Sequence, residues 1–91
     1  MGSKNLTQIP IGGKLYRFNP DAMIAYYNYR AKADAKKKKD IILELQEATN
    51  TSYEGVRSWL KPKGNNNGPD PDKIADIARV LGCDMMDLLI E

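Results

Sequence analysis

The 91-residue sequence contains no histidine, a single cysteine and no long apolar run. Histidine is the side chain that most often acts as a general base near neutral pH, so its absence removes the commonest catalytic partner. Cys83 cannot form an internal disulfide, which favours a reducing cytoplasm, and its apolar neighbours suggest a small buried side chain. No run approaches the roughly 18 apolar residues of a membrane helix, and we expect no secretory segment at the N-terminus.

Chemical motifs are equally scarce. The sequence has neither a CxxC nor an HExxH spacing for a metal, and it has no glycine-rich phosphate loop. We therefore predict that the protein is not an enzyme, that it holds no cofactor or metal, and that it has no evident small-molecule ligand. The composition, 42% hydrophobic and 29% charged, is that of a single globular domain.

Charge is unevenly distributed along the chain. Residues 1–63 contain 12 Lys and Arg against 6 Asp and Glu, whereas residues 64–91 contain 2 against 6. A domain that presents one side to a polyanion is expected to show such asymmetry. Chance combined with a need for solubility is the alternative explanation.

Residues 1–18 are predicted to form a loose arm followed by a β-hairpin. Gly12-Gly13 suits a two-residue turn, and Leu15, Tyr16 and Phe18 favour a strand. Pro10 restricts the first strand to an edge. An isolated hairpin is only marginally stable, so this one must pack on the helices or pair with a second chain through residues 9–18.

Residues 19–91 are predicted to form the main, helical domain. Asn19-Pro20 and Asp70-Pro71 each combine an N-cap residue with a proline in the first turn, and Asp84 caps a last short helix. Tyr26, Tyr27 and Tyr29 are expected to serve packing rather than base stacking. The five predicted helices cover residues 20–32, Lys38–Ala48, Ser52–Lys61, 71–81 and Met85–Ile90.

The stretch Ile42–Lys61 organises the prediction. Asn50 tolerates the left-handed conformation of a tight turn, and Ser52 is a good N-cap for the helix that follows. Val56, Trp59 and Leu60 form an apolar stripe along that helix. The opposite face carries Tyr53, Glu54, Arg57, Ser58 and Lys61. A helix held in this way can enter the major groove of DNA, which is wide enough to admit it.

Tyr53, Glu54, Arg57 and Ser58 are the predicted base contacts. Arg57 suits a bidentate contact with guanine O6 and N7, although a purely phosphate-binding role remains open. Tyr53 suits a thymine methyl or a phosphate. Glu54 suits a cytosine amino group, or an i, i+3 pair with Arg57. The predicted backbone contacts are Lys37, Lys38, Lys39, Ser52, Lys61 and Lys63. For the lysine run, a solvated turn is the alternative.

Residues 19–90 resemble the Cro/C1-type, lambda-repressor-like (XRE-family) helix-turn-helix regulators. The resemblance is carried by apolar Leu45, Val56 and Trp59 in the motif and by PDPDKIADIARVLGCDMMDLL, residues 69–89. It implies a mainly α, five-helix domain that binds double-stranded DNA as a bacterial or phage transcriptional regulator, often as a dimer on a palindromic site. An antitoxin-like or regulatory module that keeps this fold but binds a protein is the alternative.

The sequence departs from the family pattern inside the motif. The family usually has alanine at Gln46, glycine at Asn50 and aliphatic residues at Thr49 and Thr51. Gln46 suggests looser packing between the two helices, whereas Asn50 can hold the turn that glycine would. Gly55 lies inside a helix, where it costs about 1 kcal/mol relative to alanine. Close approach of a neighbouring helix or of a DNA backbone would explain it.

Overall fold

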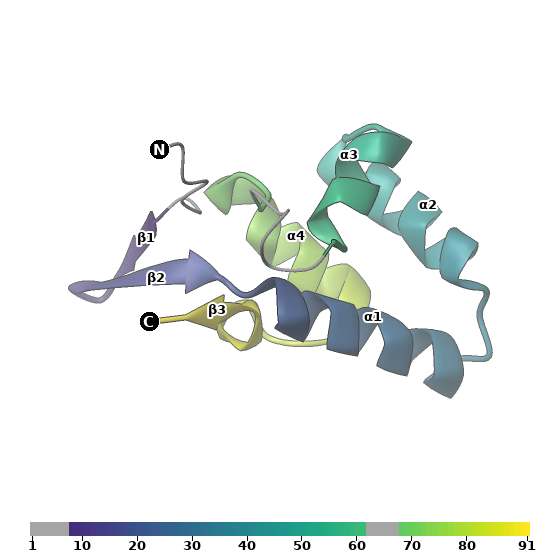
Figure 1. Ribbon diagram of the computed structural model, residues 1–91, viewed down its shortest axis with the longest axis horizontal. Coiled ribbons are helices and arrows are strands. Elements are labelled where there is room, and N and C mark those ends of the chain that lie inside the picture. Colours follow the sequence, from purple (N-terminus) through teal and green to yellow (C-terminus); the bar gives the residue numbers. More distant parts are fainter. Residues whose placement is uncertain (1–7, 62–67) are drawn as a thin grey trace.

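The computed structural model describes residues 8–61 and 68–91, which form four α-helices, a 3-10 helix and a small sheet (Figure 1). The predicted mainly α class is confirmed. In chain order the elements are β1 (Gln8–Ile11), β2 (Lys14–Phe18), α1 (Pro20–Ala33), α2 (Lys38–Thr49), α3 (Tyr53–Trp59), α4 (Pro71–Leu81), the 3-10 helix η2 (Met85–Leu88) and β3 (Leu89–Ile90).

The predicted last short helix over Met85–Ile90 is confirmed only in part, because it is a 3-10 helix that ends at Leu88. The capping box at its start is present, because the Asp84 N–H donates to Asp87 Oδ2 at 3.1 Å. After η2, however, Leu89 turns to an extended conformation and the chain pairs with β2 as β3. The edge of β2 offers backbone groups there, and β3 pairs with them at Arg17↔Ile90 and Phe18↔Leu89.

The hairpin forms as predicted, with Gly12 and Gly13 at φ 58° and 83°. Positive φ at both central residues defines a type I′ turn, whose twist matches that of the strands. With β3 the hairpin makes a three-stranded antiparallel sheet in the order β1-β2-β3, and it lies at one end of the molecule (Figure 1). Ile9 and Phe18 are buried in the core of this chain, so neither side chain is free to contact a second copy.

The outer edge of β1 is poorly suited to pairing with another strand. Counting from the two-residue turn, Ile11–Lys14 and Ile9–Tyr16 are the hydrogen-bonded pairs. Pro10 therefore directs its backbone outward, where it has no N–H to donate. Strand addition at this edge would lack a donor in its centre, which weakens the predicted dimer contact through residues 9–18.

One core joins all the elements. α4 runs through the centre of the molecule and packs against α1, α2 and η2, while α3 packs on α2 (Figure 1). The buried apolar residues are Ile9, Phe18, Met23, Tyr27, Ile41, Ile42, Leu45, Val56, Trp59, Ile74, Ile77, Ala78, Leu81, Leu88 and Leu89. Trp59 is 6% exposed, as expected for an anchor of α3 rather than a surface residue.

Three helices, α1, α2 and α4, end with a residue in the left-handed conformation, and a different residue type occupies this position in each. Ala35, Asn50 and Gly82 have φ values of 53°, 54° and 75°. In each case the next N–H donates to a carbonyl five residues earlier, which is the Schellman geometry. These bonds are Lys36 to Ala31 at 3.0 Å, Thr51 to Gln46 at 3.2 Å and Cys83 to Ala78 at 3.0 Å.

Ala35→Gly should raise the free energy of unfolding by about 0.5–1 kcal/mol. Glycine relieves the strain of a left-handed alanine in the folded state, and this relief exceeds the stabilisation of the unfolded chain by its greater conformational entropy. Gly82→Ala is the matched control and should lower the free energy of unfolding by about 1–2 kcal/mol. A Cβ at Gly82 would meet nothing within 4 Å, so its effect is purely conformational. Urea titrations measure both. A neutral or destabilising effect of Ala35→Gly would contradict a strained left-handed conformation at Ala35.

Candidate nucleic-acid interface

The turn between α2 and α3 is fixed by local hydrogen bonds. Asn50 takes the left-handed conformation, as predicted for a substitute of glycine. Buried Thr49 turns its hydroxyl back to the Leu45 carbonyl at 2.6 Å, so its methyl group can fill an apolar position without leaving a buried donor unpaired. Ser52 caps α3 by accepting from the Gly55 N–H at 3.1 Å. The angle between α2 and α3 is therefore set within a few residues.

The turn, rather than a neighbouring helix, disfavours a larger residue at Gly55. A Cβ at Gly55 would lie 2.5 Å from Cγ2 of Thr51. Thr51 cannot rotate away freely, because its hydroxyl donates to the Thr49 carbonyl at 3.1 Å and accepts from Lys73 Nζ at 3.2 Å. The second of these contacts also ties the turn to α4.

Gly55→Ala should therefore give little or no stabilisation in the native sequence, because the contact with the methyl group of Thr51 opposes the helix-propensity gain of about 1 kcal/mol. In a Thr51→Ser background the methyl is gone and the hydroxyl remains. There, Gly55→Ala should stabilise by about 1 kcal/mol. Chemical denaturation of the four proteins in this cycle measures the coupling. Equal effects in both backgrounds would show that Thr51 does not exclude the larger residue.

α3 presents a polar face to solvent. Tyr53 is 41% exposed, and Glu54, Arg57 and Lys61 are exposed beside it. Val56 and Trp59 point the other way, into the core. Ser58 fits less well as a base contact, because it is half-buried and its hydroxyl donates to the Gly55 carbonyl of its own helix at 2.6 Å. Ser52 likewise uses its side-chain oxygen as the cap. Both hydroxyls are thus engaged within α3.

Arg57 is oriented by Tyr53. Its guanidinium carbon lies 5.8 Å from the centre of the Tyr53 ring, within the range of a cation–π contact. The alternative i, i+3 pair between Glu54 and Arg57 does not form, since no ion pair among residues 8–61 and 68–91 includes Glu54. The guanidinium of Arg57 therefore lies beside the Tyr53 ring, and the Glu54 carboxylate forms no ion pair.

A groove separates α3 from α1 and from the start of α2. Its volume is about 620 Å³, within the usual range of ligand sites. On the far wall, Lys38 Nζ lies 6.0 Å from the centre of the Tyr27 ring. Burial and the nearby Tyr53 phenol raise the pKa of Tyr27, while Arg57 acts in the opposite direction. The lining residues are Tyr27, Lys38, Ile42, Tyr53, Glu54, Arg57, Leu60 and Lys61.

The lysine run lies at the first turn of α2. Lys37 is the N-cap residue, Lys38 and Lys39 follow, and all three are exposed. The N-terminus of a helix carries partial positive charge, so cations there are unfavourable by about 0.3–1 kcal/mol each. Lys61 is exposed just after α3. The predicted contact Lys63 lies outside the described residues.

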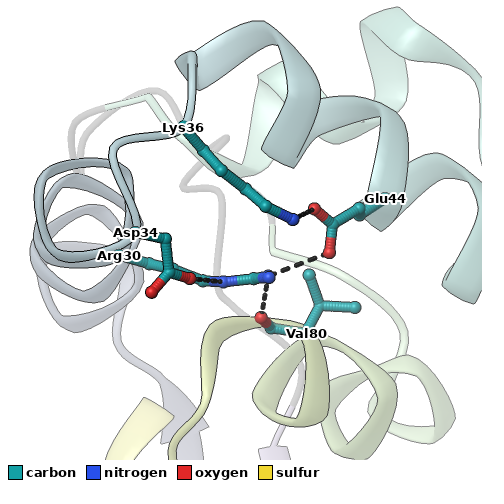
Figure 2. A network of polar contacts seen from close by, with 5 residues as sticks. All are labelled: Arg30, Asp34, Lys36, Glu44 and Val80. Atoms are coloured by element: carbon teal, nitrogen blue, oxygen red, sulfur yellow. Dashed lines mark hydrogen bonds and ion pairs between the residues drawn. The ribbon is translucent and has the colours of Figure 1, made fainter.

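Lys36 differs from its neighbours because it belongs to a polar network that joins α1, α2 and α4 (Figure 2). Arg30 contacts Asp34 and Glu44, each at 3.0 Å, and donates to the Val80 carbonyl. The hydrogen bond from Lys36 lowers the pKa of Glu44, and that with Asp34 raises the pKa of Arg30. The network fixes the start of α2, and so the position of Lys37–Lys39.

No group of three metal-ligating side chains occurs within residues 8–61 and 68–91. Over the same ranges, no helix combines the length and apolar character of a membrane span. Burial raises the pKa of the Cys83 thiol to about 11, which keeps it protonated at neutral pH.

Comparison with known proteins gives no match: the chain fits no protein-family model, and no curated protein or solved structure matches it significantly.

Proposed function

We propose that this chain binds double-stranded DNA through the exposed face of α3 and acts as a bacterial or phage-type transcriptional regulator in the cytoplasm. The observation that carries the proposal is the two-sided character of α3. Val56 and Trp59 anchor it in the core, while Tyr53, Glu54 and Arg57 face outward from a helix of the right size for the major groove. The turn at Asn50 fixes its direction.

The lysines at the start of α2 support the same proposal. Lys37, Lys38 and Lys39 occupy a place where the helix dipole disfavours them, and a phosphate backbone would offset that cost. Lys61 extends the positive charge to the end of α3. In this proposal these cations supply affinity for any DNA sequence, and the side chains of α3 supply the choice of sequence.

Within the proposal, Arg57 reads a base. Its guanidinium is already held over the Tyr53 ring, so binding immobilises fewer rotamers than it would for a freely moving arginine. Tyr53 then both positions Arg57 and contacts the DNA. Glu54, which forms no ion pair, repels phosphate and is suited to accept from a cytosine amino group. The proposal includes no catalytic step, cofactor or metal.

A protein-binding role is the second candidate. Leu15 and Ile90 are 56% and 45% exposed, and the register of the strands places both on the outer face of the sheet. A partner protein could cover them. Binding of such a partner would depend weakly on salt, whereas DNA binding releases counterions and depends on it steeply.

Selection of bound sites from a pool of random DNA duplexes tests the proposed function. We expect enrichment of one sequence, and a palindrome if the protein binds as a dimer with half-sites about one helical turn apart. Failure to retain any duplex at about 50 mM salt would contradict DNA binding. Retention without enrichment would contradict sequence-specific regulation.

A further inference from the structure

The groove between α3 and the α1–α2 junction is lined on its α1 side by Tyr27, which has no role in the proposed DNA contacts. Two of its residues, Tyr27 and Ile42, are core residues by burial, yet they reach its surface. Lys38, Arg57 and Lys61 bring three positive charges to its walls, against one negative charge from Glu54. The groove therefore favours an anionic occupant.

The Tyr27 hydroxyl is an available hydrogen-bond donor in this groove. In the described part of the chain it makes no hydrogen bond, and no side-chain oxygen that is fully buried lacks a partner. The hydroxyl must therefore reach solvent, although the residue as a whole is only 9% exposed. Packing of the ring fixes the direction of the hydroxyl, and Lys38 lies over the ring face at 6.0 Å.

The position of the groove selects the anion. A helix that enters the major groove has a sugar–phosphate strand on each side. If α3 enters the DNA, the strand on the side of α1 and α2 passes over this protein groove. A phosphate there would meet a neutral donor from Tyr27 and a cation from Lys38, the combination that charge-assisted hydrogen bonding favours.

We propose that the groove lined by Tyr27, Lys38 and Arg57 seats a phosphate of the DNA strand that flanks α3, with the Tyr27 hydroxyl donating to a phosphate oxygen. This inference rests on the proposed function and adds a contact from α1 to it. The contact carries no base information. It fixes how far α3 enters the DNA and the direction in which Arg57 points.

Tyr27→Phe removes only the hydroxyl and tests the proposal. It should weaken binding to the selected site and to random duplex about tenfold each, without changing the salt dependence, because the hydroxyl is neutral. Lys38→Gln should weaken both and flatten the slope of log K against log salt by about 0.9. Tyr29→Phe and Lys14→Gln, two exposed positions outside the groove, are the matched controls and should match the native protein.

The partner phosphate is identified by replacing single phosphates of the selected duplex with neutral methylphosphonates. At one position per half-site, the methylphosphonate should weaken binding by the native protein but should not weaken binding by Tyr27→Phe any further. If no phosphate position shows such coupling with Tyr27→Phe, the proposal is overturned. If the native protein binds DNA and Tyr27→Phe and Lys38→Gln both bind it as tightly as the native protein does, the groove inference fails and the proposed function stands. If the native protein binds no duplex, the proposed function itself fails.

A groove that instead holds free phosphate would give amide chemical-shift changes at Tyr27 and Lys38 on addition of inorganic phosphate alone. Together with unchanged DNA affinity of both variants, that result would also overturn the proposal.

Discussion

Replacing Trp59 with alanine should lower the free energy of unfolding by about 3–5 kcal/mol. Trp59 is 6% exposed and lies with Val56 on the buried side of α3. Removing the indole leaves a cavity beneath a helix of only seven residues, which has little stability of its own. A domain of this size is stable by about 5–15 kcal/mol, so the variant is expected to be partly unfolded near 37 °C.

Thermal unfolding followed by circular dichroism measures this loss. For a domain of this size the melting temperature should fall by more than about 10 °C. Tyr29→Ala is the matched control, because Tyr29 is an aromatic residue that is 70% exposed on α1, and its removal should change the melting temperature by a few degrees at most. If Trp59→Ala melted like this control, Trp59 would not be the anchor of α3.

Changing Lys37, Lys38 and Lys39 together to glutamine should weaken binding to the selected site and to random duplex alike. If each lysine contacts one phosphate, the slope of log K against log salt should flatten by about 2.7 in total. Stability should stay the same or rise slightly, because three cations leave the N-terminus of α2. Loss of affinity could then not be ascribed to unfolding.

Fluorescence anisotropy at several salt concentrations measures this slope. Lys14→Gln is the control for the removal of one positive charge far from α2, since Lys14 lies in the hairpin and pairs with Glu91 at 3.2 Å. A loss restricted to the selected site would show that the lysines read bases or order the interface. An unchanged slope would show that they remain solvated, as the alternative interpretation of the run holds.

Local signals in the sequence were sufficient for most of the fold. The Gly12-Gly13 turn, the Ser52 cap, the αL residues Asn50 and Gly82 and the proline-initiated helices all depend on residues within one or two turns of each other. Such interactions can be read from residue type and spacing alone. The outward face of α3 followed from the spacing of its apolar stripe.

Features that join distant segments were missed. β3 pairs with β2 across about 70 residues of chain, and no property of Leu89 or Ile90 indicates that partner. The spacing of Arg30 and Asp34 would have suggested their contact. Nothing local connects Arg30 to Glu44 or to the Val80 carbonyl. The groove between α3 and the α1–α2 junction likewise depends on how three helices pack together, and no local pattern in the sequence indicates that packing.

The central claim, that α3 reads DNA bases, is tested most directly by the sequence preference of Arg57→Ala. Arg79→Ala is the matched control, because Arg79 is an exposed arginine on α4 that pairs with Asp76. Affinity is measured for both variants on the selected site and on every single-base change of it. We expect Arg57→Ala to cost about 1–3 kcal/mol and to abolish preference at one position per half-site, while Arg79→Ala leaves the profile unchanged. An Arg57→Ala profile identical to that of Arg79→Ala would contradict base reading by α3.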